Sequence, residues 1–279
     1  MKSGKSGGKV KNPVVYFIVL LQTVIVLFPI YTMLIIPFKK TADIFKNPYS
    51  IPKNPVYSNF SAVWHKVNFL ALYKNSIFVT VVSIICIVVM SSLASYALTR
   101  YKFKWKSQVY FYFMAGIMIP IRLGVLNIFG IVKFLGLFDN LFSLIFVYIA
   151  MSIPISILII TNFMKQIPIA IEESALIDGC SKFQIYAQIM MPLIKPAIAT
   201  VVIYNFLPIW NDFYFPLIFI RSDMQKTIPL GVALFFGQHT TNWGVIFSAL
   251  TLACLPPILI YIAFSKYFIQ GITAGAVKG

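Results

Sequence analysis

Residues 172–179 and 189–192 form the most informative stretch of this chain. They read Glu172-Glu173-Ser174-Ala175-Leu176-Ile177-Asp178-Gly179 and Ile189-Met190-Met191-Pro192. Pro168 suits the start of a helix, the two glutamates suit the positive end of its dipole, and Gly179 suits its end. One face of this helix is apolar and consists of Ile167, Ile171 and Ala175. We therefore expect a helix of about three turns that can lie against the rest of the protein or in a groove of a partner.

A second helix is predicted to follow in the same segment. The Ser181 hydroxyl can accept a hydrogen bond from the backbone of Gln184, whose side chain can accept one from the backbone of Ser181, which is the capping-box pattern. We predict that this helix begins at Ser181 and ends at Pro192, because a proline disfavours helical backbone in the residue before it. Gly179 would join the two short helices into one stiff unit.

The composition indicates a membrane protein. Hydrophobic residues make up 59% of the 279 residues and charged residues only 11%, too few to cover the surface of a soluble domain of this size. We predict an all-α membrane protein with six transmembrane helices, since its apolar stretches reach the roughly 20 helical residues that cross a bilayer. The predicted spans are residues 13–37, 77–98, 109–129, 141–163, 197–220 and 243–264. Gly130, Lys133 and Gly136 interrupt the pattern before the fourth span, where we expect a bent or partly re-entrant connection.

Six crossings place both termini on one side of the membrane. Basic residues identify this side as the cytoplasm, because they crowd the tail at residues 1–12 and the short loop at residues 100–106. The loop at residues 165–193 and the tail at residues 268–279 then also lie in the cytoplasm. Residues 38–74 form the longest external loop, a compact cap on the membrane surface. The net charge of +16 reflects this topology and contact with anionic membrane lipid, and we expect no binding of nucleic acid.

The sequence contains no set of residues suited to catalysis. It lacks a Walker-type phosphate-binding lysine, a Ser/His/Asp set and a pair of carboxylates for one cleft. Its cysteines, Cys86, Cys180 and Cys254, are too scattered for a metal site. We expect no cofactor and no metal on this chain, so any ATP must be hydrolysed by a partner.

Polar residues in the fifth span are candidates for a translocation path. A charge at the membrane centre costs about 2.5–3.5 kcal/mol on insertion scales, so Asp212 is expected to face a pore or a partner. Trp210 offers an aromatic ring, and Asn211 and Asp212 offer hydrogen-bonding groups, the mixture expected where a polar ligand meets an aromatic surface. Tyr214 belongs to the same cluster, for which interfacial anchoring and packing between helices are equal alternatives. Arg122 in the third span either faces the cavity, where it could pair with Asp212, or snorkels to the interface.

The spacing within residues 173–192 resembles the cytoplasmic coupling loop of ABC importer permeases. That family's pattern is Glu-Ala-Ala, three residues, Gly, nine residues and Ile-x-Leu-Pro, and here only Ser174 and Met191 depart from it. Further motifs resemble permeases of the maltose-type carbohydrate importers: Pro37-Phe38-Lys39, Asp43-Ile44-Phe45, Asn59-Phe60, Trp64 and Asn75-Ser76. Residues 271–279 are nearly the ending of the second permease of such importers, with Ile272 in place of the usual Leu. The resemblance runs from about residue 14 to the end of the chain.

This resemblance implies the type I ABC importer permease fold, with the ABC transmembrane core at residues 75–267 and the coupling loop at residues 165–193. The residues that it implies for coupling to the ATPase are Glu172, Glu173, Ser174, Ala175, Asp178, Gly179 and Pro192. In the tail, the resemblance points to Gly271, Thr273 and Gly275. Such a Gly-rich segment would be disordered alone and predicts a docking surface, with an ordinary frayed terminus as the alternative.

The resemblance also implies partners. One such chain is half a pore, so we expect a heterodimer with a second permease subunit. Two ABC ATPase subunits, which hold ATP and Mg, would dock on the cytoplasmic face, and an extracytoplasmic sugar-binding protein would deliver the cargo. The expected location is a bacterial or archaeal cytoplasmic membrane.

We therefore expect a permease subunit of an ATP-driven ABC importer whose cargo is a carbohydrate, in particular an oligosaccharide. Within the same class, the alternative cargo is another solute, such as an amino acid or a peptide. In a different class, the alternative is an ion-coupled secondary transporter. That class typically has several buried carboxylates or histidines, or internal repeats with broken helices, and this sequence shows neither strongly.

Overall fold

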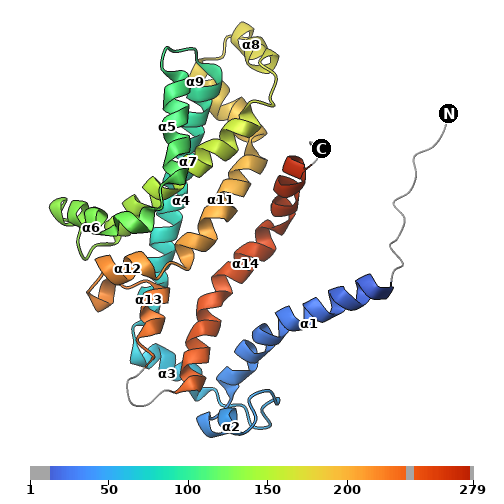
Figure 1. Ribbon diagram of the computed structural model, residues 1–279, viewed down its shortest axis with the longest axis vertical. Coiled ribbons are helices and arrows are strands. Elements are labelled where there is room, and N and C mark those ends of the chain that lie inside the picture. The colour runs from blue at the N-terminus through green and yellow to red at the C-terminus, as the bar shows by residue number, and fades with distance from the viewer. Residues whose placement is uncertain (1–12, 237–241, 277–279) are drawn as a thin grey trace. The chain divides into compact units, whose positions relative to one another are not determined.

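The computed structural model describes residues 13–236 and 242–276, with residues 66 and 264–276 described by their backbone alone. Within this part of the chain every regular element is a helix, which confirms the predicted all-α class (Figure 1). The elements in chain order are α1 (Pro13–Ile35), η1 (Ile36–Phe38), α2 (Thr41–Lys46), α3 (Ser58–Lys66), α4 (Phe69–Arg100), α5 (Lys106–Met118), η2 (Ile121–Gly124), α6 (Val125–Phe134), α7 (Leu141–Met164), α8 (Ala170–Ile177), α9 (Lys182–Gln184), η3 (Ile185–Met190), α10 (Met191–Leu193), α11 (Lys195–Trp210), α12 (Tyr214–Phe219), η4 (Asp223–Gln225), α13 (Ile228–Ala233) and α14 (Trp243–Ala276). The predicted basic tail at residues 1–12 lies outside the described residues.

The chain divides into two compact units, which are described separately. The first contains the residues up to 66 together with residues 235–252, and the second contains residues 67–234 and 253 onward. In the first unit, α1 is apolar apart from a few uncharged polar residues such as Gln22 and Thr23, and it has no buried residue. A helix that is apolar all round needs lipid or another protein surface around it.

Buried polar side chains organise the segment that follows α1. Lys39 is buried, and its ammonium donates hydrogen bonds to the carbonyl oxygens of Asn47 (2.9 Å) and Pro48 (2.8 Å). Asn59 is buried as well and donates to the carbonyl oxygens of Pro37 (2.7 Å) and Lys39 (2.9 Å). Burial lowers the pKa of Lys39, an effect that a nearby carboxylate opposes. These bonds hold the first part of the predicted cap in a compact arrangement.

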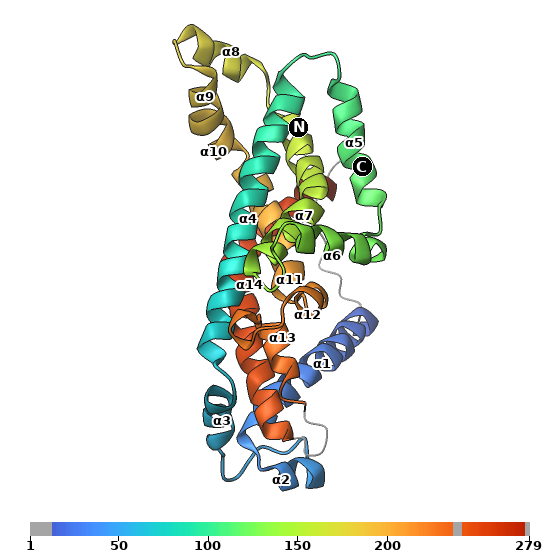
Figure 2. The same cartoon turned by 90° about the vertical axis from the view of Figure 1, so that its left-hand side faces the viewer.

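The second unit is built around α4, which packs along α7, with α11 against both (Figures 1 and 2). Small polar side chains fill these contacts. Ser91 and Ser95 of α4 are fully buried, and Ser95 Oγ donates to the carbonyl oxygen of Ile157 (3.2 Å). Asn205 Nδ2 of α11 donates to Ser156 Oγ of α7 (3.1 Å). Small residues let helices approach closely where lipid removes the hydrophobic driving force between them.

Four helices are long and apolar enough to cross a membrane. They are Pro13–Phe38, Phe69–Arg100, Leu141–Met164 and Trp243–Ala263. Two further pairs qualify if each bent pair counts as one span: Lys106–Met118 with Ile121–Phe134, bent by 84°, and Lys182–Leu193 with Lys195–Trp210, bent by 71°. The described residues thus contain four to six candidate spans by length and composition, and the topology of six crossings stays a prediction.

The predicted third span is not one straight helix. α5 ends at Met118, and the chain turns at Pro120 into η2 and α6. Proline explains the break, because it cannot donate a backbone hydrogen bond and it restricts the residue before it, here Ile119. The bend therefore lies earlier than the sequence predicts. Gly130 lies inside α6, and only Gly136, with a φ of +68°, marks the turn that follows this helix.

The predicted fifth span is interrupted as well. α11 ends at Trp210 and α12 begins at Tyr214, so residues 211–213 separate two helices within the predicted span. The second span, by contrast, belongs to a helix that starts well before residue 77. Asn68 caps α4 by accepting a hydrogen bond from the N–H of Ala71 (3.1 Å) and so sets its start at residue 69.

Candidate functional site

The coupling loop, residues 165–193, lies at one end of the second unit, with α8 beyond the end of α4 and α9 beside it (Figure 2). Its first helix, α8, has 8 residues, about two turns instead of the three expected. Gly179 follows with a φ of +83°, and its N–H donates to the carbonyl oxygen of Leu176 (3.1 Å). The N–H of Cys180 donates to the carbonyl oxygen of Ala175 (3.0 Å). These two bonds form a Schellman motif, which confirms that Gly179 ends the helix.

The second half of the loop begins with the predicted capping box. The N–H of Gln184 donates to Ser181 Oγ (3.3 Å), and the N–H of Ser181 donates to Gln184 Oε1 (2.7 Å). After α9 the chain continues as the π-helix η3 and then as α10. Helical turns therefore extend to Leu193, just past the end that the sequence predicts at Pro192. Pro192 lies in the first turn of α10, where proline is tolerated, and the chain then bends by 71° into α11.

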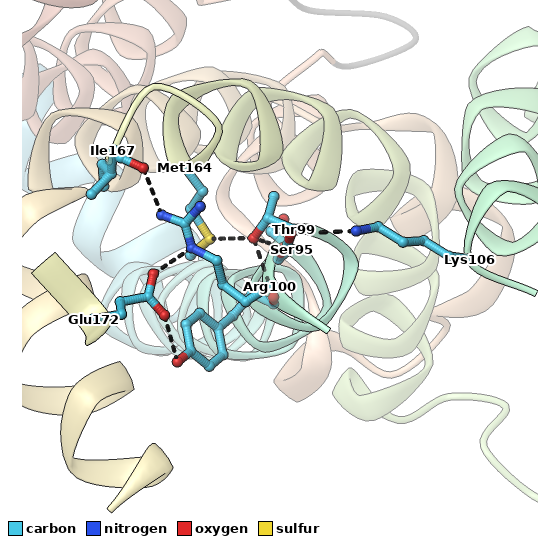
Figure 3. Close-up of polar contacts among 8 residues, drawn as sticks. Ser95, Thr99, Arg100, Lys106, Met164, Ile167 and Glu172 are labelled. Carbon is cyan, nitrogen blue, oxygen red and sulfur yellow. Dashed lines mark hydrogen bonds and ion pairs between the residues drawn. The ribbon is translucent and has the colours of Figure 1, made fainter. Parts of the chain in front are cut away.

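A buried ion pair fixes α8 to the end of α4. Arg100 Nε contacts Glu172 Oε1, and the two side chains are only 9% and 10% exposed. Arg100 Nη2 also donates to the carbonyl oxygen of Ile167 (2.9 Å), and the Tyr96 hydroxyl donates to the second oxygen of Glu172 (3.1 Å). Figure 3 shows the Arg100 guanidinium between Glu172 and Ile167. We call Tyr96, Arg100, Ile167 and Glu172 the Arg100 cluster.

The second half of the loop contacts the same end of α4. Tyr186 of η3 packs its ring against Tyr96, with centroids 5.3 Å apart, and its hydroxyl lies 2.8 Å from Ser92 Oγ. Lys182 of α9 places its ammonium 5.1 Å from the centroid of the Tyr101 ring, a cation–π contact. Both halves of the coupling loop are thus anchored to the last turns of α4 and the residue after it.

The other side of the coupling loop is exposed and partly apolar. Its exposed residues include Ile169, Ile171, Glu173, Ser174, Leu176, Ile177, Asp178, Gly179 and Phe183. Large apolar side chains exposed together on a short segment, Ile177 at 86%, mark a surface for contact with another protein or with the membrane. The expected apolar stripe is not buried as a whole in this chain. Ala175 is buried, but Ile171 is 38% exposed, and the buried position beside it belongs to Glu172, whose charge Arg100 compensates.

The predicted path residue Asp212 lies at the junction of α11 and α12. Its carboxylate accepts hydrogen bonds from the N–H groups of Tyr214 (3.3 Å) and Phe215 (3.2 Å). It therefore caps α12, where a negative charge also interacts favourably with the helix dipole. The buried Tyr148 hydroxyl of α7 donates to the same carboxylate (2.7 Å). Sequence reasoning misses Tyr148, because nothing in the apolar run around it marks it as a partner of Asp212.

The other predicted path residues surround this junction. Asn211 is exposed, whereas Trp210 is 3% exposed and donates from Nε1 to the carbonyl oxygen of Ala253 (3.2 Å). The guanidinium of Arg122 lies 5.5 Å from the centroid of the Tyr214 ring, and among the described residues Arg122 forms no ion pair. The structure thus brings these residues into one region, and their role in a translocation path stays a prediction.

A separate cavity of about 680 Å³ is lined by residues of α5, α7 and α11. Gly116 and Pro154 lie in its wall, and its polar lining residues include Ser152, Tyr204 and Asn205. Ser152 and the adjacent pair Tyr204 and Asn205 lie within apolar helices and match no motif, so sequence reasoning misses them. None of the predicted path residues belongs to this lining.

The predicted C-terminal tail is helical over most of its length. α14 continues to Ala276, so the backbone at Gly271, Thr273 and Gly275 is helical instead of irregular, and residues 277–279 lie outside the described part. Within the described residues, no group of three or more His, Cys, Asp or Glu side chains is placed to hold a metal ion.

These features define a class of protein. The described part of the chain is helical, contains four to six candidate membrane spans and carries an anchored loop of paired helices, which defines a membrane protein. Residues 87–274 match the family described as binding-protein-dependent transport system inner membrane component, and the chain belongs to this family.

Relatives and a solved structure support this assignment. The putative ABC transporter permease protein ORF2 of Caldicellulosiruptor sp. (strain Rt8B.4) is 39% identical, over 95% of this chain and 96% of its own length. The trehalose/maltose transport system permease protein MalG of Thermococcus litoralis is 31% identical, over 93% of this chain and 94% of its own. A chain from the crystal structure of a bacterial ABC transporter involved in the import of the acidic polysaccharide alginate aligns with a TM-score of 0.81 at 20% identity, covering 94% of this chain and all of that one.

The chain is therefore an ABC importer permease with the type I fold, a multi-pass component of the inner membrane. It is a transport subunit and not an enzyme, because ATP hydrolysis in such systems belongs to a partner ATPase.

Proposed function

We propose that this permease forms half of the translocation pore for a carbohydrate, in particular an oligosaccharide. The observation that carries this proposal is similarity, along nearly the whole chain, to a permease named for trehalose and maltose. The cavity between α5, α7 and α11 agrees with such a cargo, because it combines an aromatic ring at Tyr204 with the polar groups of Ser152 and Asn205. Aromatic faces and a few hydrogen-bonding groups are the mixture that sugars bind.

The other half of the pore would be a second permease subunit, giving a heterodimer. The exposed apolar surface of α1 supports a lipid or protein neighbour for that helix. Two ABC ATPase subunits would hold ATP and Mg, and an extracytoplasmic sugar-binding protein would deliver the cargo, in line with the family's description as binding-protein-dependent. In this arrangement both termini and the coupling loop lie in the cytoplasm.

The exposed side of the coupling loop would dock on one ATPase subunit. Its apolar residues Leu176, Ile177 and Phe183 suit a hydrophobic cleft, and Glu173 and Asp178 suit cations at the edge of that cleft. Closure of the two ATPase subunits on ATP would move the loop and, through its anchorage on α4, the membrane helices.

For the translocation path we propose two kinds of contribution. Asn211 and Arg122 are exposed and would meet the cargo or the second permease. Trp210, Asp212 and Tyr214 would hold the α11–α12 junction in shape, since their polar atoms or rings are engaged within this chain.

Purification from the native membrane tests the proposal. A tagged chain is extracted in mild detergent, its bound proteins are identified by mass spectrometry, and the eluate is assayed for ATP hydrolysis. We expect a second permease, an ATPase and a sugar-binding protein. Uptake of labelled trehalose, maltotriose and an amino acid by cells with and without the chain then tests the cargo. Uptake of the amino acid alone would refute the carbohydrate proposal, and transport that survives ATP depletion would refute the ABC mechanism.

A further inference from the structure

We propose that the end of α4 receives the movement of the coupling loop, and that Glu172, not its neighbour Glu173, is the residue that holds the loop to it. This inference rests on the proposed docking of the loop on an ATPase. It divides two adjacent carboxylates into a positioning residue, which faces inward, and a contact residue, which faces the partner.

The geometry of Arg100 supports this division. Its planar guanidinium reaches Glu172 of α8 through Nε and the carbonyl oxygen of Ile167, just before α8, through Nη2 at 2.9 Å. One side chain at the end of α4 thus fixes both the first turn of α8 and the backbone that leads into it (Figure 3). A rigid fork of donors defines an orientation, which a point charge such as a lysine ammonium does not.

The second half of the loop adds an independent attachment to the same place. The Tyr186 ring and hydroxyl contact Tyr96 and Ser92, and Lys182 lies over the Tyr101 ring. Ser92, Tyr96 and Arg100 follow one another at intervals of four residues and so form one stripe along α4. A movement of either half of the loop therefore acts on the same face of the same helix.

Glu173 is oriented differently because consecutive residues of a helix point about 100° apart. It is exposed, while Glu172 is buried. The ion pairs among the described residues are Arg100 with Glu172 and Lys226 with Asp223, so Glu173 stays available to a cation on a partner.

Removing one member of the Arg100–Glu172 pair should have a different effect from replacing both. Removal of one member leaves the other as an uncompensated buried charge, which is strongly unfavourable, whereas replacement of both by apolar residues is often tolerated. Glu172→Gln should therefore loosen α8 from α4. Arg100→Lys should loosen it as well, because lysine keeps the charge but lacks the fork that also reaches Ile167. The double variant Arg100→Met/Glu172→Met should fold but lack the oriented contact.

The first experiment measures attachment in the chain itself. Amide hydrogen exchange of residues 170–184 is followed for the full-length chain in detergent. We expect exchange to accelerate about tenfold or more in Glu172→Gln, because the buried pair is lost, and to stay unchanged in the matched control Glu173→Gln. Equal exchange in both variants would overturn the proposal, whatever the cargo or the partners are.

The second experiment measures coupling in the complex purified with its native partners and reconstituted in vesicles. For Glu172→Gln and for the double variant, we expect the ATPase to stay bound and the sugar transported per ATP hydrolysed to fall roughly 2- to 30-fold, the range in which network mutations alter coupling. For Glu173→Gln we expect less bound ATPase instead. Normal transport per ATP in the double variant would overturn the proposal, because packing alone would then suffice. Absence of any ATPase from the wild-type complex would refute the proposed function and leave the exchange result to decide the attachment.

Discussion

Replacement of Gly179 tests the joint between the two halves of the coupling loop. Its φ of +83° lies in the left-handed region, and a Cβ added there would meet no atom within 4 Å. The cost of a side chain therefore comes from the backbone alone, about 1–2 kcal/mol for an ordinary residue and more for a β-branched one. A cost of about 2 kcal/mol lowers the ratio of the intact to the disrupted turn roughly 30-fold.

The assay is sugar transported per ATP hydrolysed by the reconstituted complex, across the series Gly179→Asn, Gly179→Ala and Gly179→Val. We expect the loss of coupling to increase in that order, since asparagine adopts the left-handed conformation most readily of the three and valine least. The matched control is Gly136→Val, at a φ of +68° and with equally open surroundings outside the loop. It carries a similar backbone cost without touching the joint.

Two results would refute this reasoning. Normal coupling in Gly179→Val would show that the loop does not need its Schellman turn to transmit movement. Equal loss of coupling in Gly136→Val would show that the effect is one of general stability. A loss of coupling that occurs only at position 179 and increases from asparagine to alanine to valine would support the proposed role of Gly179 in connecting the two halves of the loop.

Substitutions at three further positions test other parts of the structure. Asp212→Ala should destabilise the α11–α12 junction by about 2–4 kcal/mol, measured by thermal unfolding, because it removes a helix cap and leaves the buried Tyr148 hydroxyl without its acceptor. Asp212→Asn keeps an acceptor, so preserved uptake in this variant would assign Asp212 a structural role, and lost uptake with normal stability would favour the translocation path. Ser181→Ala should cost about 1 kcal/mol and speed hydrogen exchange in the second half of the loop, and unchanged exchange would contradict the capping role. Gly231→Ala should cost about 1–3 kcal/mol in thermal unfolding, since the added methyl would overlap the Leu72 side chain, and a fully stable variant would show that this contact adjusts freely.

Local signals in the sequence predict the coupling loop well. The capping box at Ser181 and the turn at Gly179 depend on residues within five positions of each other, so short-range chemistry suffices to identify them. The predicted fourth span, residues 141–163, nearly coincides with α7, because apolar length alone defines a continuous helix between polar ends.

Long-range partners are the part that the sequence does not predict. Tyr96 and Glu172 are 76 positions apart, so no local pattern connects them. Arg100 lies at the end of an apolar helix, where a basic residue is equally well explained as a marker of membrane topology. The sequence contains only a weak signal that Glu172 is buried. Glu172 lies three residues before Ala175, so the two share one face of the helix, and that face is buried at Ala175. The sequence indicates the helix break at Pro120 more clearly, since a proline within a predicted span disfavours helical backbone in the residue before it.

The Arg100 cluster is better explained by orientation than by stability. A buried ion pair gains little over well-packed apolar residues of the same volume, because desolvation offsets most of the attraction. Apolar packing, however, would let α8 slide or rotate on α4 at low cost, and a helix of about two turns offers few contacts to prevent it. The fork of Arg100 permits one position of Glu172 and one of Ile167 at the same time. A loop that must convert the movement of a partner into movement of a membrane helix requires such a fixed register, and this requirement accounts for a charge placed where the sequence pattern favours an apolar residue.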